Sequence, residues 1–300
     1  MNGVLIINKP GGLTSHDVVN RVRRILQERS VGHLGTLDPL ATGVLPLVVG
    51  NMTRLAQFYT SAEKAYEGTI RFGFATDTYD SDGDPVGQTQ DVILSLLKLR
   101  ELAQDFHGVI QQMPPAFSAK KIQGVPAYKL ARKKQEVQLK PVQVEIKEFE
   151  ILTADGDHAT FRARVASGTY MRAIAHDMGQ RMGCGAHLES LCRTSVAEFE
   201  LAQAHTLEEL QGATAHGQLE EMFVHPRELL PQLPSVTAND EMAAKIRSGR
   251  AVNLPELSRA PIVKVFYGQR ELIAMATRVA GTLFHAKIVF AGNEVRPVEA

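Results

Sequence analysis

The chain has 300 residues, of which 44% are hydrophobic and 22% are charged, and its formal net charge at pH 7 is zero. These values are typical of a globular protein with a sizeable core, and its two cysteines are too few for a disulfide framework. We find no secretory signal and no apolar run near the roughly 18 residues of a membrane-spanning helix, so we expect a cytoplasmic protein without a membrane partner. The length favours two domains.

The N-terminal part is predicted to alternate strands with one helix. The apolar run Val4–Ile7 indicates a short buried strand. Thr14 and Asp17 have the spacing of a capping box at a helix start, and the helix then presents an apolar stripe at Val18, Val19, Val22, Ile25 and Leu26. Strands are predicted over 44–49 and 65–74, which are rich in apolar, β-branched and aromatic residues.

The middle of the chain combines a polar loop with further helices and strands. Residues 77–87 are dense in Asp, Thr, Gly and Pro and predict a loop or the edge of a hairpin. The other predictions here are a helix over 93–106, paired strands over 142–152 and 159–166, and helices over 170–182 and 187–192.

Opposite charges are segregated along the chain, although the net charge is zero. Residues 113–140 have a net charge of +6 and residues 198–241 a net charge of −8. The basic segment contains prolines, so it is not one long helix, and it is of a kind that orders on a partner. Phe117 and Tyr128 lie among its lysines, and rings of this kind stack on unpaired bases. The segment therefore indicates nucleic-acid binding.

The C-terminal part is predicted to form a small β module. Residues 231–235 have the composition of a linker. The predicted elements after it are a helix over 240–248 ended by Gly249 and three strands over 262–267, 271–277 and 282–290. About 65 residues arranged in this way suit a β-barrel-like fold.

One short segment, Gly32–Gly43, concentrates side chains that suit a reaction site. Pro39 keeps Asp38 out of the helical region of backbone space, and the glycines allow tight turns and a close approach of a ligand. Asp38-Pro39 on its own is also the pattern of a plain turn or of a helix N-terminus. A carboxylate held on a stiff loop is what a nucleophile or base needs, because it must meet one substrate atom.

Six motifs in this chain, in the same order, resemble those of the bacterial TruB family of tRNA pseudouridine synthases, which modify a uridine of the T loop. The matching segments are Asn8–Ser15, Gly32–Gly43, Lys64–Gly68, Met113–Tyr128 (two motifs of the basic segment taken together), Gly168–Arg172 and Gly183–Leu188. They run from the N-terminus to about residue 200. The C-terminal module more weakly resembles a PUA-type RNA-binding domain, on the strand order and Ile246–Arg250.

The resemblance implies both a fold and a reaction. The fold is α+β, a pseudouridine-synthase fold with a mixed, largely antiparallel sheet flanked by helices, followed by the PUA-type module. The implied domains are a catalytic domain over 1–230, with a basic RNA-gripping insertion at about 113–140, and a PUA-like domain over 236–300. The implied reaction converts uridine 55 of tRNA to pseudouridine without guide RNA, cofactor, metal or protein partner, and we expect a monomer.

The resemblance also assigns site residues by position. Asp38 is the expected catalytic residue, and Arg172 matches the arginine that pairs with it. Expected substrate-binding residues besides Arg172 are Lys9, His33, Tyr66, Tyr170 and Leu191, with Lys9 either ordering the catalytic loop or meeting a phosphate. Expected RNA contacts are Lys120, Lys121, Lys129, Arg132 and Arg193.

The sequence departs from the family pattern at three places and leaves other functions open. Leu34 and Cys192 stand where Thr and Arg are common, and Arg132 is followed by two lysines where Arg-x-Gly is usual. The loss of a cation at Cys192 gives Arg193 more of the expected RNA contact. An RNA chaperone with incidental catalytic residues, or an RNA N-glycosylase that releases the base, are the competing interpretations. Whether Asp38 attacks C1′ or deprotonates the ribose is also left open.

Overall fold

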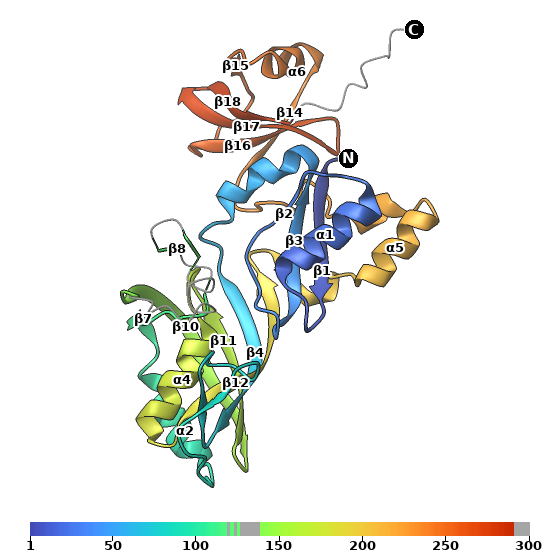
Figure 1. Ribbon diagram of the computed structural model, residues 1–300. Coiled ribbons are helices and arrows are strands. Elements are labelled where there is room, and N and C mark those ends of the chain that lie inside the picture. The colour runs from blue at the N-terminus through green and yellow to red at the C-terminus, as the bar shows by residue number, and fades with distance from the viewer. Residues whose placement is uncertain (119–120, 123–124, 127–138, 291–300) are drawn as a thin grey trace.

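The computed structural model contains two large β-sheets, of nine and five strands, one above the other in the view of Figure 1, with helices packed around the larger one. The structure describes residues 1–118, 121–122, 125–126 and 139–290. No helix in these residues is long and apolar enough to cross a membrane.

The larger sheet has nine strands and is mixed, as predicted. Its central path runs β1 (Gly3–Lys9), β3 (Thr42–Val49), β12 (Ala186–Val196), β4 (Lys64–Phe72), β11 (His158–Val165), β10 (Val142–Asp155) and β7 (Gly108–Gln112). The short strands β2 (Val31–His33) and β13 (Phe199–Glu200) pair with β3 and β12. All neighbours are antiparallel except β3 and β12, which run parallel.

Residues 4–7 of strand β1 are continuously apolar because both faces of the sheet are covered at this edge. Leu5 and Ile7 belong to one hydrophobic core, whereas Val4 and Ile6 belong to a second core on the other face. All four side chains are at most 1% exposed. A strand buried on both sides does not need the alternation of apolar and polar residues that marks a half-exposed strand.

Helices pack on the face of the large sheet that carries Leu5 and Ile7. They are α1 (Ser15–Leu26), α2 (Leu96–Gln104), α4 (Met171–Met182) and α5 (Leu207–Ala215). The predicted capping box starts α1: the Thr14 side chain accepts a hydrogen bond from the Asp17 backbone N–H, and the Asp17 carboxylate accepts one from the Thr14 backbone. The cap fixes where α1 begins, next to the loop that carries Asp38.

The C-terminal sheet has five strands and shares a core with the large sheet. Its order is β14 (Ser235–Ala238), β16 (Ile262–Tyr267), β17 (Glu271–Ala280), β18 (Leu283–Val289) and β15 (Val252–Asn253), and α6 (Asp240–Arg247) packs against it. Phe266, Met275 and Ile288 pack in the same core as Val4 and Ile6. The two sheets therefore hold each other in place through buried apolar contact.

Most predicted elements are confirmed, and three need correction. Residues 187–192, predicted as a helix, lie in the central strand β12. The helix predicted over 93–106 spans Leu96–Gln104. The predicted linker at 231–235 leads directly into β14, and Leu233 packs in the second core. Two short hairpins, β5–β6 (Ala75–Thr76, Pro85–Val86) and β8–β9 (Lys121–Ile122, Val125–Pro126), complete the fold.

Candidate active site

A cavity of about 440 Å3 lies between the loop 34–41 and the residues that lead into α4. We call the segment 34–41 the Asp38 loop; it connects β2 to β3. Besides this loop, the cavity walls include His33, Tyr59, Lys64, Tyr66, Tyr170 and Leu191. Five of the residues predicted from sequence, His33, Asp38, Tyr66, Tyr170 and Leu191, thus line one cavity although they come from distant parts of the chain.

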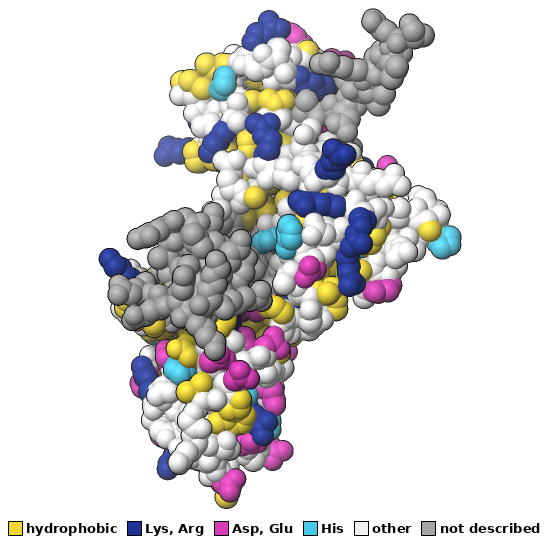
Figure 2. Space-filling model, viewed as in Figure 1, with side chains coloured by type: hydrophobic (Ala, Val, Ile, Leu, Met, Phe, Trp, Pro, Cys, Tyr) yellow, Lys and Arg dark blue, Asp and Glu magenta, His cyan; other side chains and the backbone are white. Residues whose placement is uncertain are grey.

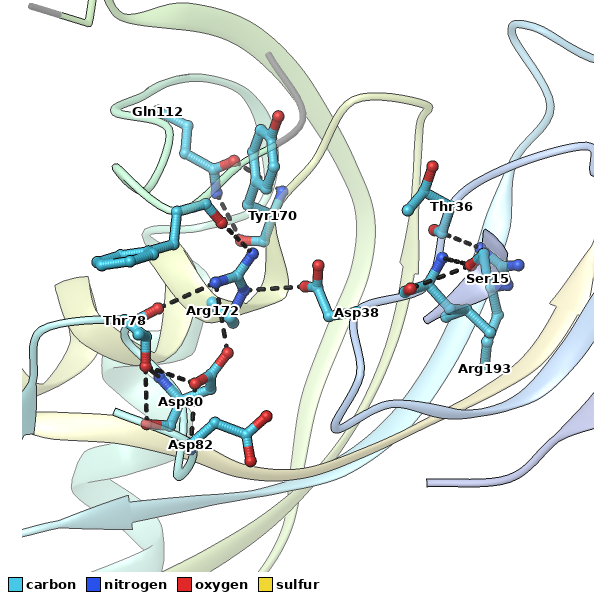
Figure 3. Close-up of polar contacts among 12 residues, drawn as sticks. Ser15, Thr36, Asp38, Thr78, Asp80, Asp82, Gln112, Tyr170, Arg172 and Arg193 are labelled. Atoms are coloured by element: carbon cyan, nitrogen blue, oxygen red, sulfur yellow. Dashed lines mark hydrogen bonds and ion pairs between the residues drawn. The ribbon is translucent and has the colours of Figure 1, made fainter. Parts of the chain in front are cut away.

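Asp38 is held by Arg172, the second residue of α4. The Arg172 Nε atom lies 2.9 Å from Asp38 Oδ2, and its Nη1 atom lies 3.3 Å from Asp80 Oδ2 (Figure 3). Arg172 also donates hydrogen bonds to the carbonyls of Thr78 (3.1 Å) and Phe117 (2.9 Å). The Arg172 side chain is only 5% exposed, so these partners fix its position. The expected pairing of Arg172 with Asp38 is present.

The two carboxylates beside Arg172 differ in their surroundings. The Asp38 side chain is 39% exposed, and that of Asp80 is 6% exposed. Burial raises the pKa of Asp80, whereas its hydrogen bond from the Thr78 hydroxyl (2.5 Å) and the charge of Arg172 oppose that rise. Asp80 therefore serves as a buried support for Arg172, and Asp38 is the carboxylate that faces the cavity.

The Asp38 loop is also held by Arg193 on β12. Arg193 is fully buried and donates hydrogen bonds to the carbonyls of Gly35 (3.1 Å), Thr36 (3.2 Å) and Val44 (2.8 Å). Strand β12 comes so close to β3 at this point that a Cβ on Gly43 would lie 2.3 Å from the Arg193 carbonyl oxygen. Only a glycine allows this approach, which puts the guanidinium under the loop.

A serine and a lysine from the N-terminal part of the chain also hydrogen-bond the Asp38 loop. The Ser15 hydroxyl accepts a hydrogen bond from the Leu37 N–H (2.8 Å) and donates one to the Leu37 carbonyl (3.1 Å). Lys9 is fully buried, and its Nζ donates to the carbonyls of Pro10 (2.8 Å), Leu13 (2.6 Å) and Pro39 (3.2 Å). The residues on both sides of Asp38 are thus anchored, so its carboxylate is presented from a rigid backbone.

Lys9 and Arg193 are therefore buried under the Asp38 loop, whereas a residue that contacts RNA would be exposed. Each is 0% exposed, and each directs its donors at backbone carbonyls of the Asp38 loop or its neighbours. For Lys9 this matches the loop-ordering role, one of the two that the sequence left open. For Arg193 it differs from the expected contact with RNA, because buried carbonyls take the place that a phosphate would fill. The guanidinium and the Tyr66 hydroxyl also influence each other electrostatically.

The cavity walls offer aromatic and apolar faces. Tyr66 on β4 is 7% exposed, and burial raises the pKa of its hydroxyl, so the phenol is neutral. Tyr170 caps α4 and is fixed to the end of β7, because its backbone N–H and carbonyl both hydrogen-bond the Gln112 side-chain amide (2.8 and 3.1 Å). Leu191 adds an apolar wall from β12. A flat ring would find surfaces to stack on between these residues.

His33 stands at the rim of the cavity at the end of β2. Its Nδ1 accepts a hydrogen bond from the Gly35 N–H (3.3 Å), which leaves the proton of the neutral ring on Nε2. Burial, with Arg193 and His16 nearby, lowers the pKa of His33 below its ordinary value. The ring is therefore neutral at pH 7.

Comparison with known proteins decides the family. The family models described as "TruB family pseudouridylate synthase (N terminal domain)" and "tRNA pseudouridylate synthase B C-terminal domain" match residues 23–171 and 172–231. The chain is 48% identical to "tRNA pseudouridine synthase B" of Solibacter usitatus, over 96% of this chain and 100% of that protein. The chain belongs to the TruB family.

Other TruB relatives and one solved structure agree with this assignment. The "tRNA pseudouridine synthase B" of Geobacillus thermodenitrificans is 40% identical over 85% of this chain and 87% of that protein. A structure described as "Crystal Structure of a Cbf5-Nop10-Gar1 Complex" matches with a TM-score of 0.71 and 25% identity, over 96% of this chain and 85% of that chain. These matches confirm the predicted pseudouridine-synthase fold with its C-terminal PUA-type sheet, and the TruB assignment makes the chain an enzyme.

Sequence reasoning missed Asp80 and Thr78, which the structure brings to Arg172. Both lie in the segment 77–87, whose composition predicts only a polar loop, so no signal in the sequence pointed to them. Of the basic residues expected to grip RNA, Lys120, Lys129 and Arg132 are outside the described residues, and Lys121 is described only as part of strand β8. Figure 2 shows lysine and arginine side chains over the C-terminal sheet and the neighbouring N-terminal elements, whereas acidic side chains gather on the lower part.

Proposed function

We propose that this TruB enzyme converts uridine 55 in the T loop of tRNA to pseudouridine, with Asp38 as its catalytic residue and without a guide RNA. The observation that carries the proposal is the ion pair of Arg172 with Asp38 at the wall of a cavity lined by Tyr66, Tyr170 and Leu191. The relatives named tRNA pseudouridine synthase B, one of them 48% identical over nearly the whole chain, supply the substrate class.

The reaction conserves the atoms of the nucleotide. The bond between N1 of uracil and C1′ of ribose breaks, the detached uracil turns, and C5 bonds to C1′. The C5 proton leaves to solvent and N1 takes up a proton, so no oxidant, reductant or group donor is needed. The enzyme has to supply a carboxylate at the ribose and a pocket that retains the free base.

The residues of the cavity suit these tasks. The Asp38 carboxylate can add to C1′ or remove a proton from C2′, and in both cases the ion pair with Arg172 orients it. Tyr66 and Tyr170 offer ring faces to the flipped uracil, and stacking offsets the few kcal/mol that nucleotide extrusion costs. The neutral Tyr66 hydroxyl is proposed to relay the C5 proton, accepting it on oxygen while its own O–H proton passes to solvent. His33 is proposed to fill the space that the flipped base leaves.

The remaining chain is proposed to hold the tRNA. Residues 1–230 form the proposed catalytic domain, with the insertion at about 113–140 gripping the T arm through Lys120, Lys121, Lys129 and Arg132. Residues 236–300 form the proposed RNA-binding domain. We propose a cytoplasmic monomer that acts on tRNA without a protein partner; the relatives named tRNA pseudouridine synthase B, which match 96% and 85% of this chain, support tRNA as the substrate.

Tritium release tests the proposal. A tRNA transcript with tritium at uracil C5 is incubated with the purified protein alone, and tritium in water is followed. We expect release near one per tRNA for the wild type and none for Asp38→Asn, which is expected to keep most of its tRNA affinity. Full release by Asp38→Asn would overturn the catalytic assignment, and release only after addition of another RNA would overturn guide independence.

The same reaction separates the competing functions. An RNA N-glycosylase would leave free uracil and an abasic site, whereas isomerisation leaves the mass of the RNA unchanged. An RNA chaperone would assist folding without releasing tritium. Mass spectrometry of the digested RNA, run beside the tritium assay, distinguishes the three.

A further inference from the structure

Lys64 is the one lysine or arginine among the described residues that line the catalytic cavity. The other three cations of the site, Lys9, Arg172 and Arg193, are not part of the cavity wall. Their donors are engaged by backbone carbonyls and carboxylates, so they have little to offer an incoming anion.

The Lys64 ammonium has few partners of its own. Lys64 is the first residue of β4, and its Nζ donates one hydrogen bond, to the Ala62 carbonyl (2.7 Å). The adjacent carboxylate of Glu63 pairs with Lys147 instead (2.5 Å). Among the residues that the structure describes, no carboxylate lies within ion-pair distance of Lys64. An ammonium has three N–H donors, so two remain for a ligand.

The place of Lys64 suits a phosphate at the cavity mouth. Its Cε atom lies 3.5 Å from where a Cβ on Gly35 would stand, so its stem packs on the Asp38 loop. Lys64 and Tyr59 also line a second cavity of about 430 Å3, so each belongs to the walls of both cavities. A nucleotide whose base enters the catalytic cavity keeps its phosphates outside the base pocket, within reach of a cation in the cavity wall. Burial and the nearby Arg193 lower the pKa of Lys64 to about 8, and an anion would favour its charged form.

We propose that Lys64 binds a backbone phosphate that flanks the flipped nucleotide and so positions its ribose against Asp38. The inference rests on the proposed function, because it takes an RNA nucleotide as the ligand. Lys64 is a positioning residue in this proposal: it contacts the phosphate, while the bonds that change are at C1′, N1 and C5. A phosphate bound by one charged hydrogen-bond donor contributes about tenfold to a hundredfold in affinity.

The test is a double-mutant cycle in which one change removes the charge of an RNA phosphate and the other removes the Lys64 ammonium. T-arm stem–loop RNAs carry a neutral methylphosphonate at the 5′ or the 3′ phosphate of the target uridine, with 2′-O-methyl groups that keep the linkage stable. The reference RNA has the same 2′-O-methyl groups and native phosphates. Dissociation constants are measured for Asp38→Asn, which prevents turnover, with Lys64 either retained or replaced by methionine. Methionine preserves the apolar stem that packs on Gly35.

We expect one of the two methylphosphonates to weaken binding by about tenfold or more when Lys64 is present, and by less than twofold in Lys64→Met. The dissociation constant of Lys64→Arg should stay within about threefold of the value for the protein that retains Lys64. The logarithm of the association constant falls as log salt rises, and Lys64→Met should make this slope shallower by about 0.7. Lys98→Met, on the exposed surface of α2, is the matched control. Its dissociation constants for the methylphosphonate RNAs should equal those of the protein that retains both Lys64 and Lys98.

The outcomes separate the inference from the function on which it rests. If each methylphosphonate weakens binding by the same factor in the protein that retains Lys64 and in Lys64→Met, the phosphate contact is overturned. Melting temperatures of the variants show whether Lys64→Met is folded, and Lys64→Arg carries the test if it is not. Tritium release by the wild type from unmodified tRNA is scored separately, so its failure would overturn the proposed function itself.

Discussion

Arg172 approaches Asp38 with its Nε atom, at 2.9 Å, while both of its Nη atoms are taken by other partners. The guanidinium is therefore not free to follow Asp38 if the carboxylate moves. Because Asp80, Thr78 and Phe117 hold the far side of Arg172, the position of Asp38 is set by the hairpin β5–β6 and the end of the segment 113–118 as well as by its own loop. The predictions below concern the groups that hold Asp38 in this way.

Replacing Arg172 by lysine should separate charge from geometry. The ammonium keeps the positive charge but has no planar fork, so it cannot reach Asp38, Asp80 and two carbonyls together. We expect the single-turnover rate of tritium release to fall by about a hundredfold or more. Arg162→Lys, in an exposed pair with Glu150, is the control and should keep full activity. A rate for Arg172→Lys within threefold of the wild type would contradict the positioning role.

Asp80 should make the reaction sensitive to acid. Burial raises its pKa above the ordinary value, so the carboxyl takes up a proton at a higher pH than an exposed aspartate does. Protonated Asp80 no longer pairs with Arg172, so the wild-type rate should fall as the pH is lowered through the raised pKa. Asp80→Asn should be slower by about tenfold at pH 7 and flatter on the acid side.

The measurement for Asp80 is the pH profile of the single-turnover rate. Asp91→Asn is the control, because Asp91 is an exposed aspartate whose carboxylate has no contact with Arg172 and is not among the groups that raise the pKa of Asp80. An acid limb of unchanged position and depth in Asp80→Asn would show that another group is responsible for it.

The sequence predicted the members of the site better than their arrangement. His33, Asp38, Tyr66, Tyr170 and Leu191 line one cavity as the motif positions implied. Their spacing along the chain says nothing of this proximity, so the resemblance was the only guide to it. Asp80 escaped because its partner Arg172 lies far along the chain, and a loop rich in Asp and Gly has the same composition with or without such a partner.

Two differences between expectation and structure have a common physical cause, which is burial at the centre of the large sheet. Leu188 and Leu191 have the spacing of a helix face, yet both lie in β12, which is flanked by β3 and β4 and does not have to alternate. Arg193 in the same strand was expected to contact RNA. The carbonyls of the Asp38 loop, which no sequence pattern displays, satisfy its donors in the interior instead.

Arg193 should therefore contribute to stability more than to RNA affinity. Arg193→Met leaves the buried carbonyls of Gly35, Thr36 and Val44 without their donor. We expect the free energy of unfolding to fall by about 3 kcal/mol, measured by urea denaturation. Arg181→Met, which removes an exposed pair with Asp105, should cost less than about 1 kcal/mol. Unchanged stability with a raised dissociation constant for tRNA would instead support the RNA contact.

Lys9 should give the protein a component of stability that grows with pH. Burial lowers its pKa from 10.5 to about 8, so between these values the unfolded chain holds the proton that the folded chain has released. Because the unfolded state binds more protons there, the free energy of unfolding rises with pH, by at most about 1.4 kcal/mol per pH unit for one group. Lys9→Met lacks this rise, so the difference in unfolding free energy between wild type and variant should grow from pH 8 to pH 10.

Lys98→Met, at an exposed position of α2, serves as the control and should follow the wild-type slope. Parallel pH curves for the wild type and Lys9→Met would contradict the burial of a lysine that loses its proton in the folded state.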